Sequence, residues 1–118
     1  MTEPRLPGFA RAQRQALARA AGPLAESEDD WTRWVLDYAT RVARPAWEHY
    51  HTRNSRGSRA GFPDWVLWRE RVIFVELKSE GGRVKREQWA VIDGLRAAGA
   101  EVHIWRPSMR ATVAEVLR

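Results

Sequence analysis

The sequence predicts one α/β domain of the α+β kind, with the element order α-β-β-β-α-β-α. Its 118 residues suit a single domain with a modest core. Two segments, beginning near residues 28 and 85, carry apolar residues at helical spacing. Short β-prone segments at 47–51, 65–68 and 72–78 lie between these helices, and one at 101–105 follows them. We therefore expect strands packed between helical layers.

The first helix is expected from about residue 28 to Arg44. Ser27 is a suitable N-cap, the next residues are acidic, and Pro45 ends the helix. Apolar residues follow at helical spacing: Trp31, Trp34, Val35, Tyr38 and Val42. Positions 28, 31, 35, 38 and 42 lie along one inward stripe. Glu28 falls at the N-terminal end of that stripe. It is therefore the first-turn acid that we expect to point inward.

The middle of the chain predicts a β-hairpin. If its turn centres on Glu70, residue 68 pairs with 72 and 66 with 74, so that Asp64 faces Glu76. Their Cβ atoms would lie about 5 Å apart, with Lys78 on the same face. The other face is wholly apolar and contains Trp65, Leu67, Ile73, Val75 and Leu77. Charges so placed are costly unless they are paired or bind a metal.

Lysine is itself unusual in this sequence. Only Lys78 and Lys85 among the 20 basic residues are lysine. Because lysine is a compact point donor whereas arginine is a planar fork, the exception favours selection for an amine at position 78. The alternative is a Glu-Lys pair on an edge strand that reaches into water.

The second half predicts a helix from about Lys85 to Ala98, with Gly99 as its C′ residue. Its expected inward residues are Gln88, Trp89, Ile92 and Leu95. The strand 101–105 and a last helix from Ser108 to Leu117 complete the order. We expect core positions for all seven tryptophans, with base stacking as the alternative for Trp68 and Trp89.

The charge of the chain indicates an anionic partner. The net charge of +5 ranks nucleic acid first, anionic membrane second and acidic protein third. Arginines, hydroxyl residues and glycines gather at 51–61, a segment suited to phosphate oxygens or, alternatively, a solvated connector. The candidate nucleic-acid contacts are His51, Arg53, Ser55, Arg56, Arg59, Arg83 and Lys85. For His51 the alternative is a strand-end histidine bonded to the backbone.

Several protein classes are disfavoured. The chain has no cysteine, which excludes disulfides and thiolate sites and fits a reducing compartment. No apolar run approaches the roughly 20 residues of a membrane helix, so we expect a cytoplasmic protein that does not enter a membrane. Residues 1–25, with three prolines, are expected to form a variable, mobile arm ahead of a folded domain at 26–118.

These residues together predict a metal site. Two carboxylates on adjacent strands, a third from a helix end and a nearby amine suit a hard, oxygen-seeking cation, for which Mg²⁺ is the natural candidate and Mn²⁺ a substitute. Beside a basic loop, such a set predicts phosphodiester hydrolysis. Metal-activated water attacks phosphorus, while the metal and the lysine stabilise the developing charge.

The motifs resemble a known pattern. Pro63-Asp64, eleven further residues and Glu76-Leu77-Lys78 look like the PD-(D/E)xK nuclease signature. An extended set resembles the VRR-NUC family of that superfamily: Gly61-Phe62-Pro63-Asp64, Glu76 to Glu80, Gly82-Arg83, Glu87-Gln88, Ala98-Gly99 and Trp105-Arg106-Pro107. The likeness covers roughly residues 27 to 117. It implies a restriction-endonuclease-like core with a central mixed sheet flanked by helices, of the stand-alone phage or bacterial type.

The resemblance also implies roles for particular residues. Asp64 and Glu76 would be metal ligands, the Leu77 backbone carbonyl would complete the shell, and Lys78 would orient water or stabilise charge. Glu28 and Gln88 would flank the metal as further catalytic groups, Glu28 also as a ligand. Two departures stand out: Thr32 replaces a common glutamine, and Lys85-Arg86 replaces the usual Thr-Pro.

The expected function is that of a divalent-metal-dependent DNA endonuclease acting on branched or nicked duplexes. One alternative is a sequence-specific restriction-type endonuclease. Another is a non-catalytic DNA-binding module that keeps the nuclease fold, and a third is a basic interaction protein whose acids form surface pairs. Analogy with junction resolvases suggests a homodimer.

Overall fold

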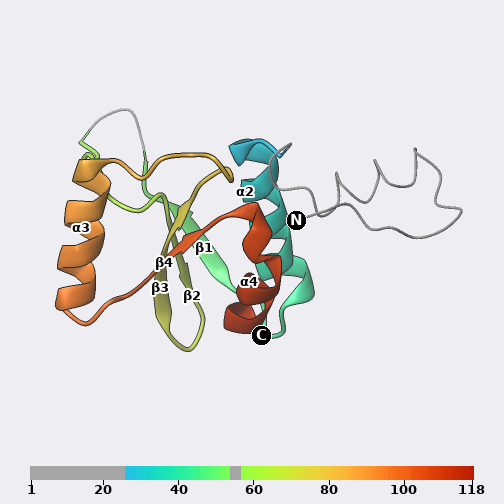
Figure 1. Cartoon of the computed structure of the whole chain (residues 1–118). Coiled ribbons are helices and arrows are strands. Elements are labelled where there is room, and N and C mark those ends of the chain that lie inside the picture. Colours follow the sequence, from blue (N-terminus) through green and yellow to red (C-terminus); the bar gives the residue numbers. More distant parts are fainter. Residues whose placement is uncertain (1–25, 54–56) are drawn as a thin grey trace, which may run out of the picture.

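The computed structural model describes residues 26–53 and 57–118 as a four-stranded sheet between helices (Figure 1). The elements follow in the order α2 (Glu28–Asp37), η2 (Tyr38–Val42), β1 (Glu48–His51), β2 (Trp65–Trp68), β3 (Val72–Leu77), α3 (Arg86–Ala97), β4 (Glu101–Trp105), η3 (Pro107–Met109) and α4 (Arg110–Leu117). The predicted order of helices and strands is confirmed. The expected arm at 1–25, and Ser55 and Arg56, lie outside the described residues.

The sheet is mixed, with strand order β1-β2-β3-β4. β1, β2 and β3 pair antiparallel, and β3 pairs parallel to β4 across the α3 crossover. Trp68 lies opposite Val72, and Val66 opposite Phe74, which confirms the predicted hairpin register. The residues just beyond this ladder, 64 and 76, are thereby brought onto one face of the sheet.

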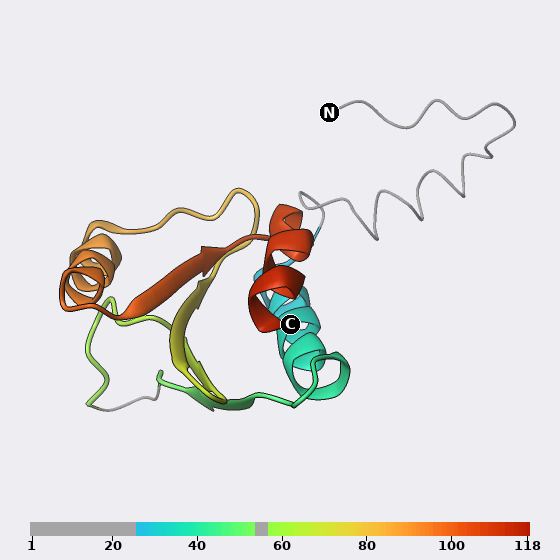
Figure 2. The same cartoon turned by 90° about the horizontal axis from the view of Figure 1, so that it is seen from below.

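Helices cover both faces of the sheet, as Figure 2 shows with α3 on one side and α2 and α4 on the other. The larger core lies under α2 and α4 and contains the apolar hairpin face that the sequence predicts. A smaller core of Val84, Ile92 and Val102 lies under α3. Glu76 belongs to the α3 face because it alternates with Val75 and Leu77.

The first helix differs from its prediction. It is α-helical only to Asp37 and continues as a π-helical turn, in which Ala43 donates to the Tyr38 carbonyl at 2.9 Å. The buried stripe becomes Trp31, Val35, Ala39 and Ala43. Val42 is 58% exposed, because the wider turn displaces it from the packed face.

The core positions predicted for two tryptophans are also wrong. Trp68 is 39% exposed at the end of β2, and Trp89 is 42% exposed on α3, so neither is a core residue. Trp31 and Trp47 match the core prediction, and their indole nitrogens donate to the carbonyls of Trp105 and Leu117. No helix of the described residues is long and apolar enough to cross a membrane.

Candidate active site

Asp64 and Glu76 meet on the α3 face of the sheet. Asp64 immediately precedes β2, and Glu76 is the second-to-last residue of β3. Both side chains are buried. The Asp64 backbone amide donates to Glu76 Oε1 at 3.3 Å. The hairpin register therefore places two acids side by side where water is scarce.

Lys78 and Gln88 complete the surroundings of Glu76. Lys78 Nζ lies 3.3 Å from Glu76 Oε2, and Gln88 Nε2 donates to the same oxygen at 2.9 Å. Gln88 Oε1 accepts from the Lys85 backbone amide at 2.8 Å, at the start of α3. Because its oxygen is held by that N–H, the amide must present its nitrogen to Glu76. The first turn of α3 thus fixes the direction of the Glu76 carboxylate.

The electrostatics of Glu76 reflect this confinement. Burial first, and the charge of Asp64 second, raise the pKa of Glu76 from 4.5 to about 7, while Lys78 opposes the change. The side chain has no exposed surface. A cation bound between the two acids would relieve both their repulsion and the cost of burial.

Arg53 pairs with the other acid. Its Nη2 lies 2.8 Å from Asp64 Oδ1, and its side chain is 63% exposed while that of Asp64 is 8% exposed. Thr52 aligns the two chain segments: its amide donates to the Asp64 carbonyl at 2.8 Å and its hydroxyl to the Pro63 carbonyl at 2.6 Å. Sequence reasoning named Arg53 as a phosphate contact and missed this ion pair, which depends on the path of a loop.

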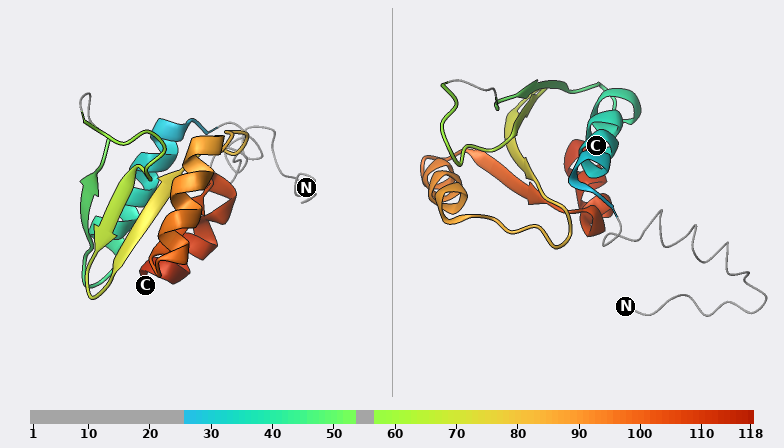
Figure 3. Two further views of the ribbon diagram at one scale, coloured as in Figure 1. Left: turned by 90° about the vertical axis from the view of Figure 1, so that its left-hand side faces the viewer. Right: turned by 90° about the horizontal axis from the view of Figure 1, so that it is seen from above.

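A pocket of about 460 Å³ lies beside the acids, between the segment 57–62 and the start of α3. Its polar lining residues are Thr52, Arg53, Ser58, Arg59, Lys85, Glu87 and Gln88, so that three cations outnumber one acid. Figures 1 and 3 both show the segment 57–62 running to the end of α3 where that helix begins. The pocket therefore combines cations with hydrogen-bonding groups next to Asp64 and Glu76.

Gly61 makes this arrangement possible. Its φ is +87°, and a Cβ at this position would lie 2.4 Å from the Glu87 carbonyl oxygen. Only glycine lets the loop approach the backbone of α3 so closely. The contact seats the loop on the helix turn that carries Gln88.

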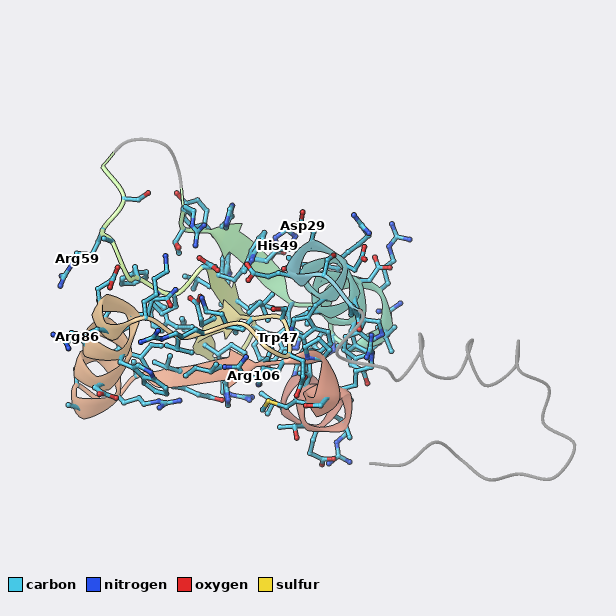
Figure 4. The ribbon with its side chains drawn as sticks, turned by 45° about the horizontal axis from the view of Figure 1, so that its top comes forward. Asp29, Trp47, His49, Arg59, Arg86 and Arg106 are labelled. Atoms are coloured by element: carbon cyan, nitrogen blue, oxygen red, sulfur yellow. The ribbon has the colours of Figure 1, made fainter. Side chains whose placement is uncertain are left out.

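The remaining predicted nucleic-acid residues are spread out. His51 stacks on Trp65 with ring centroids 4.5 Å apart, and its register pairing with Trp65 places it on the sheet face opposite Glu76. Arg83 and Lys85 are exposed near α3. Arg59 and Arg86 extend outward at the α3 end of the molecule in Figure 4. Arg53, Arg59 and Lys85 are thus brought to the pocket, whereas His51 is not.

Glu28 does not point inward as expected. It is exposed, because the packed face of α2 begins one turn later, at Trp31. The acid that turns inward is Glu26, which contacts Arg110 Nη2 through both carboxylate oxygens at 2.7 and 2.8 Å. Over residues 26–53 and 57–118, no three histidine or acidic side chains form a group able to hold a metal.

Arg106 and Glu80 organise the turn after Lys78. Arg106 Nη1 donates to the carbonyls of Ser79, Glu80 and Gly82 at 2.6 to 3.0 Å. Glu80 accepts from the Ser108 amide and hydroxyl, so it links this turn to the start of the last helical segment. Arg106 lies toward the middle of the molecule in Figure 4, consistent with this role.

The oxygen donors present suit Mg²⁺. Two adjacent carboxylates provide the charge, and Mg²⁺ ordinarily keeps several waters and needs only one or two protein carboxylates. The missing third carboxylate is therefore no obstacle. Burial and the neighbouring Asp64 charge, which raise the pKa of Glu76, make two bare carboxylates unfavourable at this position.

A mixed sheet between helices, with an aspartate beside the glutamate of a Glu-x-Lys motif, is the arrangement expected of a nuclease-type domain. The family model described as the VRR-NUC domain matches residues 12–109, well over half of the 118-residue chain. A search of curated proteins gives no match. The chain belongs to the VRR-NUC family, and the resemblance inferred from its motifs is confirmed.

Proposed function

We propose that this domain is a divalent-metal-dependent DNA endonuclease that acts at Asp64 and Glu76. The observation that carries the proposal is the buried placement of these two residues side by side, in which the Asp64 backbone amide donates to Glu76 Oε1 at 3.3 Å and the Lys78 amine lies 3.3 Å from Glu76 Oε2. Two like charges buried together are costly without a cation. Such a pair beside an amine suits phosphoryl chemistry, in which a growing negative charge needs stabilisation.

Each protein group has a distinct role in this proposal. Bound Mg²⁺ or Mn²⁺ would supply activated water and neutralise phosphate charge. Asp64 and Glu76 would hold the ion, with the Leu77 carbonyl as a further oxygen ligand. Lys78 would orient the attacking water or stabilise charge on the phosphate, and Gln88 would keep the Glu76 carboxylate aimed at the ion. A contribution of Glu28 stays a prediction.

The basic pocket supports DNA as the substrate. Arg59 and Lys85 line it, close enough to the acids for Gln88 to belong to both. Contacts of this kind bind phosphates without reading a base sequence. These 118 residues contain no motif of a separate sequence-reading module. Both facts favour recognition of a DNA shape, such as a branch or a nick.

The proposal is tested by following supercoiled plasmid on a gel with Mg²⁺, with Mn²⁺ and with a chelator. The wild type should nick or linearise the plasmid only with metal. Asp64→Asn and Glu76→Gln should abolish cleavage, and Lys78→Ala should lower it while largely sparing metal affinity. Asp93→Asn, which changes an exposed acid on α3 that does not line the pocket, is the matched control and should cut like the wild type.

Cleavage that survives in both acid variants would contradict the proposal. Binding without cleavage by the wild type would favour a non-catalytic module. Flaps, bubbles and four-way junctions should then be cut faster than linear duplex of the same sequence. Equal rates on all of them would contradict selectivity for DNA shape.

A further inference from the structure

Arg53 occupies an unusual place for a residue expected to contact phosphate. Its guanidinium lies against Asp64 Oδ1 at 2.8 Å, at the acid proposed to hold the metal. Most of the Arg53 side chain is exposed, whereas that of Asp64 is buried. The contact is therefore charge neutralisation of a buried acid by a cation that reaches in from the surface.

The chain holds Arg53 in this position through its backbone. Thr52 is fastened to Pro63 and Asp64 by two hydrogen bonds, of 2.6 and 2.8 Å. The next residue in the chain therefore begins beside the aspartate. The two acids have different partners. Glu76 contacts the buried amine of Lys78 and the buried amide of Gln88. Among the described residues, the only ion-pair partner of Asp64 is the exposed guanidinium of Arg53.

A divalent ion and Arg53 compete for Asp64. A metal-bound carboxylate oxygen lies about 2.0–2.1 Å from Mg²⁺, too close for a guanidinium to keep its hydrogen bond to the same oxygen without strong repulsion between the cations. Lys78 and Gln88 hold Glu76 Oε2, so the exposed partner is the one that can leave. Arg53 also lines the basic pocket. A guanidinium displaced from Asp64 would remain there, within reach of a bound DNA phosphate.

We propose that Arg53 is a cationic occupant of the metal centre, which neutralises Asp64 in the metal-free protein and is released to a DNA phosphate when a divalent ion binds. The inference rests on the proposed function, to which it adds a thermodynamic coupling between metal binding and DNA binding. Metal binding should strengthen DNA binding, and DNA should strengthen metal binding by the same factor; the release of Arg53 adds to the direct attraction between the ion and the phosphate.

The first test is calorimetric titration of the metal-free protein with Mn²⁺ in the absence of DNA. Arg53→Gln should bind Mn²⁺ roughly fivefold more tightly than the wild type, because an ion pair with one exposed partner no longer has to be broken. Arg59→Gln removes the same charge from the same pocket without touching Asp64 and should change the affinity much less. Arg53→Lys, which keeps the charge and loses the fork, should fall between wild type and Arg53→Gln.

The second test measures DNA affinity with and without Mn²⁺ in a Lys78→Ala background, in which cleavage should be slowed. Mn²⁺ should increase DNA affinity, and adding Arg53→Gln should make that increase measurably smaller, leaving the part due to direct attraction between the ion and the phosphate. Adding Arg59→Gln instead should weaken DNA binding equally with and without Mn²⁺.

The outcomes separate the two proposals. If the wild type binds Mn²⁺ and Asp64→Asn does not, but Arg53→Gln and Arg59→Gln behave alike, the role of Arg53 is overturned while the proposed function stands. Such a result would mean that the ion takes Asp64 Oδ2 and leaves Arg53 in place. If the wild type binds no Mn²⁺ at all, the proposed function fails and the inference fails with it.

Discussion

Replacing Gly61 with alanine probes the contact that seats the basic loop on α3. Gly61 has φ of +87°, and an added Cβ would lie 2.4 Å from the Glu87 carbonyl oxygen and 2.7 Å from its carbonyl carbon. Both atoms belong to backbone and cannot move aside as a flexible side chain would. The loop must therefore retreat from the helix turn that presents Gln88.

The loss of folding stability expected for Gly61→Ala has two contributions. A left-handed backbone costs a non-glycine residue about 1–2 kcal/mol. Forcing a methyl group into a filled contact adds about 1–3 kcal/mol. Gly99→Ala provides the matched control, because its φ is +95° but no atom lies within 4 Å of the added Cβ. Gly61→Ala should therefore destabilise the domain by about 2 kcal/mol more than Gly99→Ala.

The assay is urea unfolding of both variants and the wild type, together with plasmid cleavage at a temperature where all three are folded. Gly61→Ala should have the lower unfolding midpoint and reduced cleavage, and Gly99→Ala should cut at the wild-type rate. Equal losses of stability in the two variants would refute the reasoning, because they would show that backbone conformation alone matters at Gly61.

Three further predictions concern the site and its support. Because the pKa of Glu76 is raised to about 7, its contribution to the stability of the metal-free protein is complete below about pH 4.5 and is lost as pH rises through 7. Urea unfolding between pH 5 and pH 8 should show a loss of about 2 kcal/mol that Glu76→Gln removes, and an unchanged slope in that variant would contradict the assignment. Gln88→Met keeps the side-chain volume but removes two hydrogen bonds, one of them to the Glu76 carboxylate. It should lower the free energy of unfolding in urea by about 1.5–3 kcal/mol and weaken Mn²⁺ binding. Wild-type values of both quantities would refute the role of Gln88. In Arg106→Lys the amine ends short of the position that Nη1 occupies, so the contacts to the three carbonyls are stretched or lost and the melting temperature should fall. A shift no larger than that of the exposed control Arg83→Lys would count against the role of Arg106 in holding this turn.

The hairpin was predictable because its signals are local. Two apolar runs separated by a charged turn define the register, and side-chain alternation then assigns every residue to a face. Asp64, Glu76 and Lys78 could therefore be grouped from the sequence. The helical pattern turned Gln88 inward, but its approach to Glu76 followed only from the family resemblance, because the packing of a helix on a sheet is not a local property.

The incorrect or missing predictions concern features that residue spacing does not determine. The turn at Tyr38–Val42 has one more residue per hydrogen-bonded turn than an α-helix, so an α-helical stripe misplaces Val42. Glu28 was assigned to a buried face that begins only at Trp31. The Arg53–Asp64 pair depends on a loop path set by long-range contacts of Thr52, which no spacing rule provides.

Anomalous diffraction from crystals of the protein grown with Mn²⁺ would show directly whether Asp64 and Glu76 jointly hold the catalytic ion. We expect a manganese peak between the two carboxylates, about 2.0–2.2 Å from an oxygen of each, with Lys78 still beside Glu76 and Arg53 moved away from Asp64. A peak elsewhere in a well-ordered domain, or no peak at saturating Mn²⁺, would contradict it.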